Sequence, residues 1–522
     1  MTLSSRKMRI PTRLFLAVAV LGYAGNAAAQ SQLADLIQDG RSTEANQLIA
    51  AGADVNRAQA DGTTPLHWAV YRKDAALVGQ LLDHGADANV SNRFGAAPLN
   101  EAVKLADAGL VEQLLEAGAD PEATNTDGQT ALMLSARTGS VAVARSLVTH
   151  GADVNALESW RGQTALMWAA GENFPALVEF LIDAGADVTA RAVTNDWGSQ
   201  ITSEPRAQYR PTGGLTALLY AARSGCSGCI EAIVAAGEPV DRPTPDGVTP
   251  LMLAIDNLEF NAAAKLLDLG ANPHYADWWG RTALYIAIDM NSDIPGRPNA
   301  GSMNAGGTNF NALDIATRLL DAGVEVNPQL NMHRVGRGGN SQRFTDDNLT
   351  TGATPLIRTA LTHDHAAMQL LLEHGAIVDL PNVMGTTPLM AAASIGVRDV
   401  DFGTNRSPSF ATDLEIEDKV IESLRILLAA GADINSRIMD TESRSARIAR
   451  PSQFTDRSGQ TALFRVAEQG WVRVTEFMLA NGADPEIVDA QGHKALDAAL
   501  GRLVSGAPVH QEVAALLTAA MN

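Results

Sequence analysis

Cysteine, aromatic residues and net positive charge are all scarce in this chain. Two cysteines among 522 residues are too few for a protein held together by a disulfide framework. Aromatic residues make up 5% of the sequence, and 59 acidic residues outnumber 39 basic ones, which gives a formal net charge of -20. A surface of this sign repels nucleic acid and anionic lipid, so neither is a predicted partner.

No apolar run reaches the ~20 residues that a membrane-spanning helix requires. Near the start, a basic segment is followed by the short apolar stretch Leu14 to Leu21 and by three alanines that end at Ala29. This order is typical of a secretory signal peptide, with cleavage near Ala29/Gln30. We therefore expect residues 1–29 to be removed, no membrane insertion after cleavage, and a periplasmic or secreted location. An uncleaved N-terminal anchor is the alternative.

Motifs that mark enzymes and cofactor sites are missing as well. The sequence has no glycine-rich phosphate loop, no nucleophile elbow and no His-Glu-x-x-His pattern. A stretch that begins like a calcium loop at Asp289 has Ile294 where that loop requires glycine. His363 and His365 supply only two imidazoles, which do not complete a zinc site. We predict no catalytic residue, no metal site and no cofactor.

Glycine, by contrast, recurs at a fixed period. One series has gaps of 33 or 34 residues, apart from three gaps of 52, 72 and 74: Gly62, Gly95, Gly128, Gly162, Gly214, Gly247, Gly280, Gly352, Gly385, Gly459 and Gly492. A second series runs out of phase with it, often as Gly-Ala-Asp: Gly52, Gly85, Gly118, Gly151, Gly185, Gly237, Gly270, Gly323, Gly375, Gly431 and Gly482. A repeat of this length is the mark of a solenoid.

Each period predicts a turn, a short helix, a loop and a second helix. Gly62 suits a tight turn, Thr64 an N-cap and Pro65 the first helical position. The second helix is predicted to end at a left-handed glycine such as Gly85. The two series together give twelve units, with an atypical first and last unit as capping requires.

The tetrapeptide Thr64-Pro65-Leu66-His67 resembles the helix start of the ankyrin repeat, and partial matches recur along the chain. The resemblance implies a stack of antiparallel helix pairs whose hairpin-like connections, the fingers, project to one side and bind proteins. We therefore predict an all-α ankyrin-repeat solenoid of about twelve helix-pair repeats, with finger-side loop insertions, over residues 30–522. The segments Arg161 to Ala170 and Gly214 to Arg223 also resemble exported, uncharacterised bacterial ankyrin-repeat proteins.

Five insertions interrupt the period, near residues 191–213, 291–310, 328–351, 398–418 and 437–458. The first, third and fifth extend fingers, and the other two lengthen the loop between paired helices. The finger insertions combine aromatic residues with arginine, a composition typical of interfaces: Trp197, Arg206, Tyr209, Arg210, Arg337, Arg343, Phe344, Arg444, Arg447, Arg450 and Phe454. Either these residues bind a partner, or the arginines pair with acidic fingers and fold the loops back.

One position in the first helix varies widely in chemistry. In register it holds Trp68, Glu101, Leu134, Trp168, Tyr220, Leu253, Ile286, Arg358 and Arg465. A position that accepts tryptophan, glutamate and arginine is not expected to be fully buried. Trp68, Trp168 and Tyr220 would then form a spaced aromatic stripe for binding, joined by Arg358 and Arg465. Alternatively, the aromatic rings cover neighbouring helices.

The two cysteines, Cys226 and Cys229, lie at the start of a predicted second helix. In an oxidising compartment they are candidates for a local disulfide. A Cys-x-x-Cys pair at a helix N-terminus can also be a redox motif, although no thioredoxin-like pattern surrounds this one.

The predicted function is a non-catalytic, exported scaffold that binds a protein partner through its concave face and finger loops, as a monomer. Two alternatives stay open. One is a periplasmic redox- or stress-protection factor that uses Cys226 and Cys229. The other is a secreted effector that binds a host protein.

Overall fold

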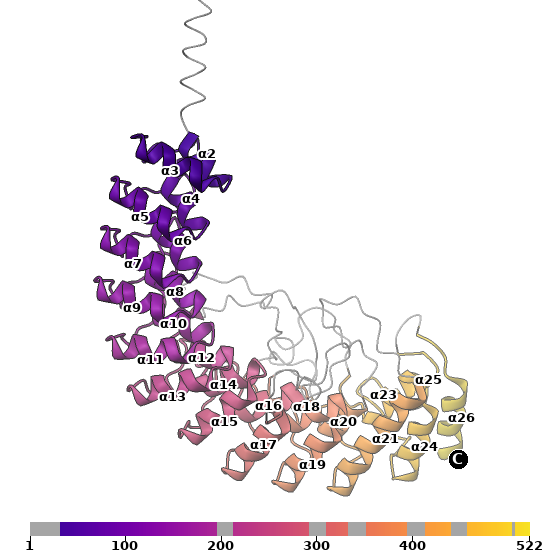
Figure 1. The fold of residues 1–522 in the computed structure, drawn as a ribbon. Helices are drawn as coiled ribbons and strands as arrows, with labels where there is room; N and C mark the ends of the chain where they lie inside the picture. Colours follow the sequence, from indigo (N-terminus) through magenta and orange to yellow (C-terminus); the bar gives the residue numbers. More distant parts are fainter. Residues whose placement is uncertain are drawn as a thin grey trace, which may run out of the picture. The chain divides into compact units, whose positions relative to one another are not determined.

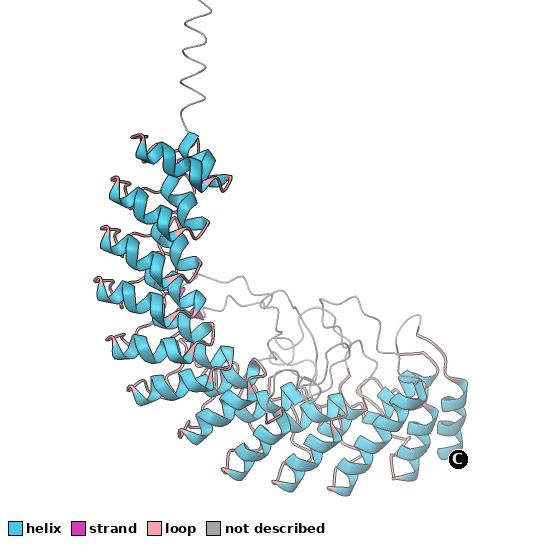
Figure 2. Cartoon of the chain, viewed as in Figure 1, coloured by secondary structure: helices cyan, strands magenta, loops and turns pink. Residues whose placement is uncertain are grey.

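The computed structural model describes residues 32–195, 212–291, 309–331, 351–393, 413–439, 457–503 and 507–522. The predicted signal peptide lies outside these ranges. Internal contacts divide the chain into two units, Met1–Ala192 and Val193–Asn522. The described ranges contain twenty-four helices and one pair of two-residue strands. Figure 2 shows helices as the main element of both units.

The first unit contains five helix pairs among its described residues (Figure 1). Its first helices pack against one another in a row, and its second helices form another row beside them. The pairs are α2 (Gln32–Gln38) with α3 (Ser42–Ala50), α4 (Pro65–Tyr71) with α5 (Ala75–Asp83), α6 (Pro98–Lys104) with α7 (Ala108–Glu116), α8 (Ala131–Thr138) with α9 (Val141–Thr149), and α10 (Ala165–Gly171) with α11 (Pro175–Asp183).

The second unit contains seven pairs in its described ranges, and β1 (Thr194–Asn195) with β2 (Thr212–Gly213) precedes them. The pairs are α12 (Ala217–Ser224) with α13 (Ser227–Ala235), α14 (Pro250–Asp256) with α15 (Phe260–Asp268), α16 (Ala283–Asn291) with α17 (Ala312–Asp321), α18 (Pro355–Thr362) with α19 (His365–Glu373), α20 (Pro388–Ala392) with α21 (Asp413–Ala429), α23 (Ala462–Gln469) with α24 (Val472–Ala480), and α25 (Ala495–Ala499) with α26 (Gln511–Ala520).

The helix boundaries follow from the predicted capping chemistry. Seven threonines directly before a first helix accept a hydrogen bond from the third helical N–H, as Thr164 does from Met167 at 3.3 Å. All glycines of both series have a positive φ, between 62° and 107°. At Gly62 a side chain would also stand 3.3 Å from the Cα of Asn92, so the turn requires glycine.

One insertion differs from its predicted loop. The stretch 398–418 was expected to lengthen the connection between paired helices, but helix α21 already begins at Asp413 and runs for 17 residues. The extra N-terminal turns place Glu417 beside the next pair, where its Oε2 accepts hydrogen bonds from the backbone N–H groups of Arg473 at 2.8 Å and Val474 at 3.2 Å. Part of this insertion therefore supports the following pair.

The aspartate of Gly-Ala-Asp is a structural residue that ties one finger to the next. Asp54 Oδ1 accepts the N–H of Asn56, whose Nδ2 donates to the carbonyl of Gly85 at 2.8 Å. The Oδ1 of Asn56 in turn accepts the N–H of Asp87 at 2.7 Å. The same links recur at Asn89 and Asn155 in the first unit, and at Asn435 in the second. These repeated aspartates therefore have a structural role, and they account for part of the negative charge of the chain.

Candidate protein-binding surface

Each finger, the segment from a second helix to the next first helix, turns within a short hydrogen-bonded loop. In the finger of Asn92, Gly95 N donates to Asn92 O at 2.9 Å and Asn92 N donates to Ala96 O at 3.0 Å. The Oδ1 of Asn92 also accepts the N–H groups of Phe94 and Ala96. This closure fixes the backbone at the finger tip and therefore the direction in which Phe94 projects.

Two of the finger insertions keep both hydrogen bonds of this closure and the third keeps the bond from glycine, while all three replace the polar residue by an apolar one. Leu330 accepts from Gly352 N at 2.7 Å and donates to Ala353 O, and Ile438 does the same with Gly459 at 2.7 Å and Gln460. Val193 accepts from Gly214 N at 3.1 Å, next to the β1–β2 pair. The insertions therefore lie inside the finger turn. In the sequence, an apolar residue at the position equivalent to Asn92 therefore marks a finger that carries an insertion.

The predicted interface residues of these insertions lie outside the described ranges. They are Trp197, Arg206, Tyr209, Arg210, Arg337, Arg343, Phe344, Arg444, Arg447, Arg450 and Phe454. Whether they bind a partner or fold back onto the array stays a prediction.

Exposed apolar side chains gather on the fingers, and most of them lie on fingers of ordinary length. Of the twelve large apolar side chains exposed in the described ranges, nine lie on fingers: Phe94, Leu157, Trp160, Val193, Tyr275, Trp278, Ile377, Met439 and Val488. Because these side chains recur on one kind of element in both units, the fingers are the candidate binding surface.

The two most exposed aromatic rings of the first unit project from finger tips. Phe94 is 72% exposed and Trp160 is 77% exposed, and the guanidinium of Arg161 lies 4.8 Å from the Trp160 ring. In the fingers before and after that of Phe94, the residue equivalent to Phe94 is Asp61 and Asp127, respectively. The predicted binding residues lay in the finger insertions and on the first helices, so these tip residues were missed. An aromatic residue in place of the usual aspartate was the available signal.

The variable position of the first helix is more buried than expected, which corrects the prediction from its composition. Ile286, Arg358, Leu134, Tyr220 and Arg465 are 1%, 2%, 4%, 8% and 9% exposed. Arg358 Nε lies 2.6 Å from Asp289 Oδ1 of the preceding pair, and Arg465 Nη1 lies 2.6 Å from Glu468 Oε2. An ion-paired carboxylate makes burial of each arginine possible, so neither residue presents a free guanidinium to a partner.

The aromatic residues at this position contact their neighbours. Trp68 is half-buried, donates from Nε1 to Gln59 Oε1 at 2.8 Å, and meets Tyr71 edge-on. Trp168 is half-buried beneath the guanidinium of Arg137, which belongs to the preceding pair. Tyr220 lies under Arg223 in the second unit. Glu101 and Leu134 separate the two tryptophans, so the first unit shows no continuous stripe and the covering interpretation fits better.

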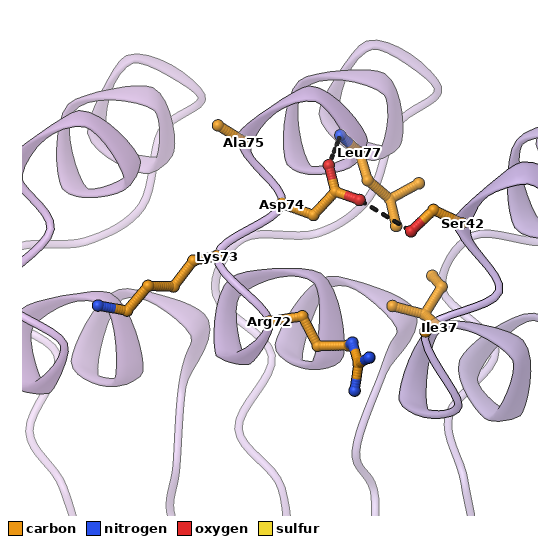
Figure 3. A pocket seen from close by; sticks show the side chains of 8 residues that line it. Ile37, Ser42, Arg72, Lys73, Asp74, Ala75 and Leu77 are labelled. Carbon is orange, nitrogen blue, oxygen red and sulfur yellow. Dashed lines mark hydrogen bonds between the residues drawn. The ribbon is translucent and has the colours of Figure 1, made fainter.

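A depression of about 350 Å³ lies between the first two pairs, lined in part by Ser42, Arg72, Lys73 and Asp74. Figure 3 shows Asp74 hydrogen-bonded to Ser42 Oγ, at 2.9 Å, and to Leu77 N, at 3.1 Å. The carboxylate of Asp74 therefore caps α5, whereas Arg72 and Lys73 are exposed.

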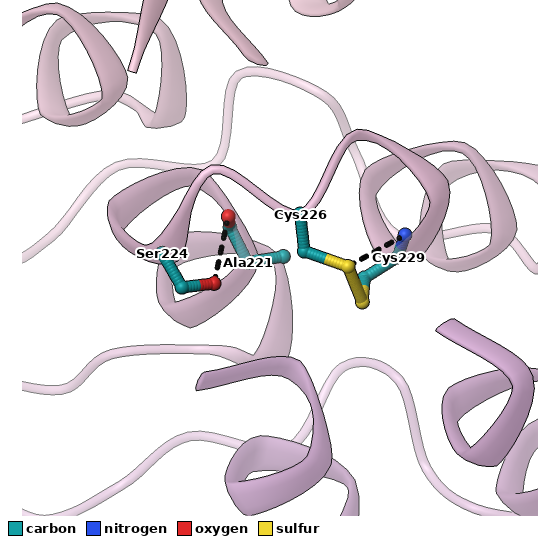
Figure 4. Close-up of a disulfide and its surroundings, with 4 residues drawn as sticks. All are labelled: Ala221, Ser224, Cys226 and Cys229. Atoms are coloured by element: carbon teal, nitrogen blue, oxygen red, sulfur yellow. Dashed lines mark hydrogen bonds between the residues drawn. A yellow bond between two sulfur atoms is a disulfide. The ribbon is translucent and has the colours of Figure 1, made fainter. Parts of the chain in front are cut away.

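Cys226 and Cys229 are joined in a disulfide at the start of α13 (Figure 4). Cys226 occupies the N-cap position that aspartate or serine holds in other pairs, and its Sγ lies 3.1 Å from Cys229 N. The two residues are 1% and 0% exposed. Thiol–disulfide exchange requires access to a sulfur atom, which this burial denies to external thiols.

The ranges with described placement contain no cluster of three His, Cys, Asp or Glu residues arranged to hold a metal ion. Within the same ranges, no helix has the length and apolar character needed to cross a bilayer.

Comparison with protein-family models agrees with this architecture. A family model for ankyrin repeats in three copies matches residues 33–125, 99–192, 201–277 and 218–294. A crystal structure of the human ASB11 ankyrin repeat domain is 23% identical, with a TM-score of 0.39, and the match covers 47% of this chain and 100% of that chain. No curated protein matches the chain. The helix pairs and the family-model matches together show that the chain is an ankyrin-repeat solenoid.

Proposed function

We propose that this chain is an exported, non-catalytic scaffold that binds a partner protein through its fingers. Ankyrin repeats generally mediate protein–protein interaction, which supports binding as the activity. The observation that carries the proposal is the concentration of exposed apolar side chains on fingers. Large aromatic residues next to arginine dominate the energetics of many interfaces, and Trp160 with Arg161 has that composition.

The closed finger turn favours binding because it orders the contact residues in advance. The backbone on both sides of Phe94 is fixed by hydrogen bonds to Asn92, and the N–H of Arg93 donates to Asp61 O of the preceding finger at 2.9 Å. Trp160 N likewise donates to Glu158 Oε2. Binding then costs less conformational entropy than it would on a free loop.

Capture of a partner from an extract of the producing cells tests this proposal. The paired substitution Phe94→Ser and Trp160→Ser should weaken capture more than about tenfold, since aromatic anchors of an interface contribute at least that much. Leu414→Ser with Val509→Ser is the matched control, because these two side chains are also exposed but lie away from the fingers. Equal loss in both variants, or no loss in the finger variant, contradicts binding through the fingers.

Export is proposed from the order of basic, apolar and small residues at the start of the chain. N-terminal sequencing of the protein recovered from the periplasm or the medium should begin at Gln30. Recovery of the protein with Met1 intact in the cytoplasm would reject export. A redox role is less well supported, because both sulfur atoms of the cysteine pair are buried.

A further inference from the structure

Exposed cations line the C-terminal ends of three successive first helices in the first unit. Arg72 and Lys73 follow α4, Lys104 ends α6, and Arg137 lies in the last turn of α8. All four side chains are exposed, in a chain whose net charge is -20. These four residues are called the basic strip below.

Contacts between pairs make the basic strip continuous across packed helices. Arg72 Nη1 donates to Gln38 O at 3.1 Å, at the end of α2, and Lys73 Nζ reaches Leu105 O at the C-cap of α6. Arg137 lies over the ring of Trp168 in α10. The cations therefore form one line along α4, α6 and α8, which pack in that order.

Of the carboxylates near the basic strip, one forms an ion pair with a strip residue among the described residues. Glu101 pairs with Lys104 at 2.8 Å. Asp74 and Asp107 use their carboxylates to cap the following helices, at Leu77 N and Leu110 N. Glu172, at the end of α10, is exposed. Three of the four cations thus have a carbonyl or an aromatic ring as their recorded contact and no carboxylate.

Complementing the helix dipole does not account for the basic strip. A cation near a helix C-terminus is stabilising, but the corresponding helix ends of the second unit hold Asp256 and Asp289. These carboxylates are matched by Arg281, 3.8 Å from Asp256, and by Arg358. The fold therefore accepts either sign at this position. Arg223 in α12 of the second unit takes the same place as Arg137, but α14 and α16, the next two first helices, hold aspartate there, so among the described residues only the first unit has cations at this position on three successive first helices.

We propose that the basic strip binds an extended acidic segment of the partner protein. This inference rests on the proposed function and adds the chemistry of the partner. Guanidinium groups bind carboxylates through paired hydrogen bonds, which Arg72 and Arg137 can offer. Beside Arg72, the ring of Tyr71 is 60% exposed and offers an apolar surface on which a side chain between the carboxylates of the segment can pack.

Fluorescence anisotropy with three short synthetic peptides and the full chain tests the proposal. The peptides share the same leucine and phenylalanine positions and differ only in carrying Glu, Gln or Lys at the others. The Glu peptide should bind, and raising the salt concentration from low to physiological should weaken it several-fold because exposed charges are screened. Absence of binding by the Glu peptide, or equal binding by the Gln peptide, overturns the proposal.

Charge reversal locates the site. Arg72→Glu and Arg137→Glu should each lower the affinity for the Glu peptide by roughly threefold or more, which is the scale of an exposed charge contact. Arg145→Glu is the matched control, since Arg145 belongs to the same repeat as Arg137 and stacks on Phe180 at 4.8 Å, but lies on the second helix. Equal losses in all three variants would reject the basic strip as the site.

A single-stranded oligonucleotide of equal charge serves as a further probe. If the oligonucleotide binds as strongly as the Glu peptide, the basic strip attracts anions in general and does not recognise an acidic polypeptide, which would overturn the proposal. Failure of these tests leaves the finger proposal untouched, because partner capture that depends on Phe94 and Trp160 is measured separately. Loss of capture in the finger variant with normal Glu-peptide binding would likewise separate the two surfaces.

Discussion

At the C-cap of α18, the imidazole of His363 is buried against α21. Its Nδ1 lies 2.7 Å from Ser423 Oγ, and the Nε2 of His365 lies 3.0 Å from the same hydroxyl. Burial, together with the nearby His365 and Lys419, lowers the pKa of His363 to about 3. This residue therefore stays neutral in the folded protein at pH values where it would be protonated in an unfolded chain.

We expect His363 to make the second unit sensitive to acid. Above its ordinary pKa of about 6.5, both states are neutral at this residue, and its contribution does not change with pH. As the pH falls from there towards 3, only the unfolded state takes up the proton, so stability is lost progressively, by about 2 kcal/mol between pH 7 and pH 5. His363→Asn, which tolerates the left-handed backbone there (φ 52°), should reduce that loss in urea unfolding curves.

The control for this prediction is His274→Asn, because His274 is exposed on a finger of the same unit. It should leave the pH dependence of unfolding unchanged. If the His363 and His274 variants lose stability in parallel as the pH falls, other groups cause the acid sensitivity.

At the scale of the helix, local chemistry predicted most boundaries, because the capping residue and the helix it caps are adjacent in sequence. Thr164 before Ala165 and Gly185 after α11 are examples, and both behave as expected. Helix α24 has Trp471 at its N-cap, which offers no side-chain oxygen, and Glu417 from α21 takes that role. That cap comes from the preceding pair and could not be predicted from neighbouring residues.

Burial within the first helices could not be predicted from composition for the same reason. Arg358 was expected to reach the surface because of the residue types found at its position in the repeat. Its partner Asp289 lies in the preceding helix pair, and an insertion separates the two residues in sequence. No residue close to Arg358 in sequence therefore indicates the ion pair. The finger tips, in contrast, were predictable: Phe94 directly precedes Gly95 and Trp160 lies two residues before Gly162, so the glycine series places both at finger turns.

For the molecule as a whole, the glycine period predicted the solenoid and about twelve helix pairs, since a fixed repeat reports architecture directly. The division of internal contacts after Ala192 was not predicted. It coincides with the first finger insertion, where Val193 replaces the polar turn residue. A repeat array holds together mainly through contacts between neighbours, so its response to damage should depend on distance along the chain.

The substitution Leu166→Asp tests this nearest-neighbour behaviour. Leu166 is 1% exposed in α10, so the aspartate would bury an unpaired charge and destabilise its repeat by at least about 3 kcal/mol. Hydrogen exchange should show the largest loss of amide protection in α8 to α11 and nearly normal protection in α23 to α26. Leu157→Asp, on a finger where Leu157 is 60% exposed, is the control and should change little. Equal loss of protection in both units would mean that the array unfolds as one cooperative body.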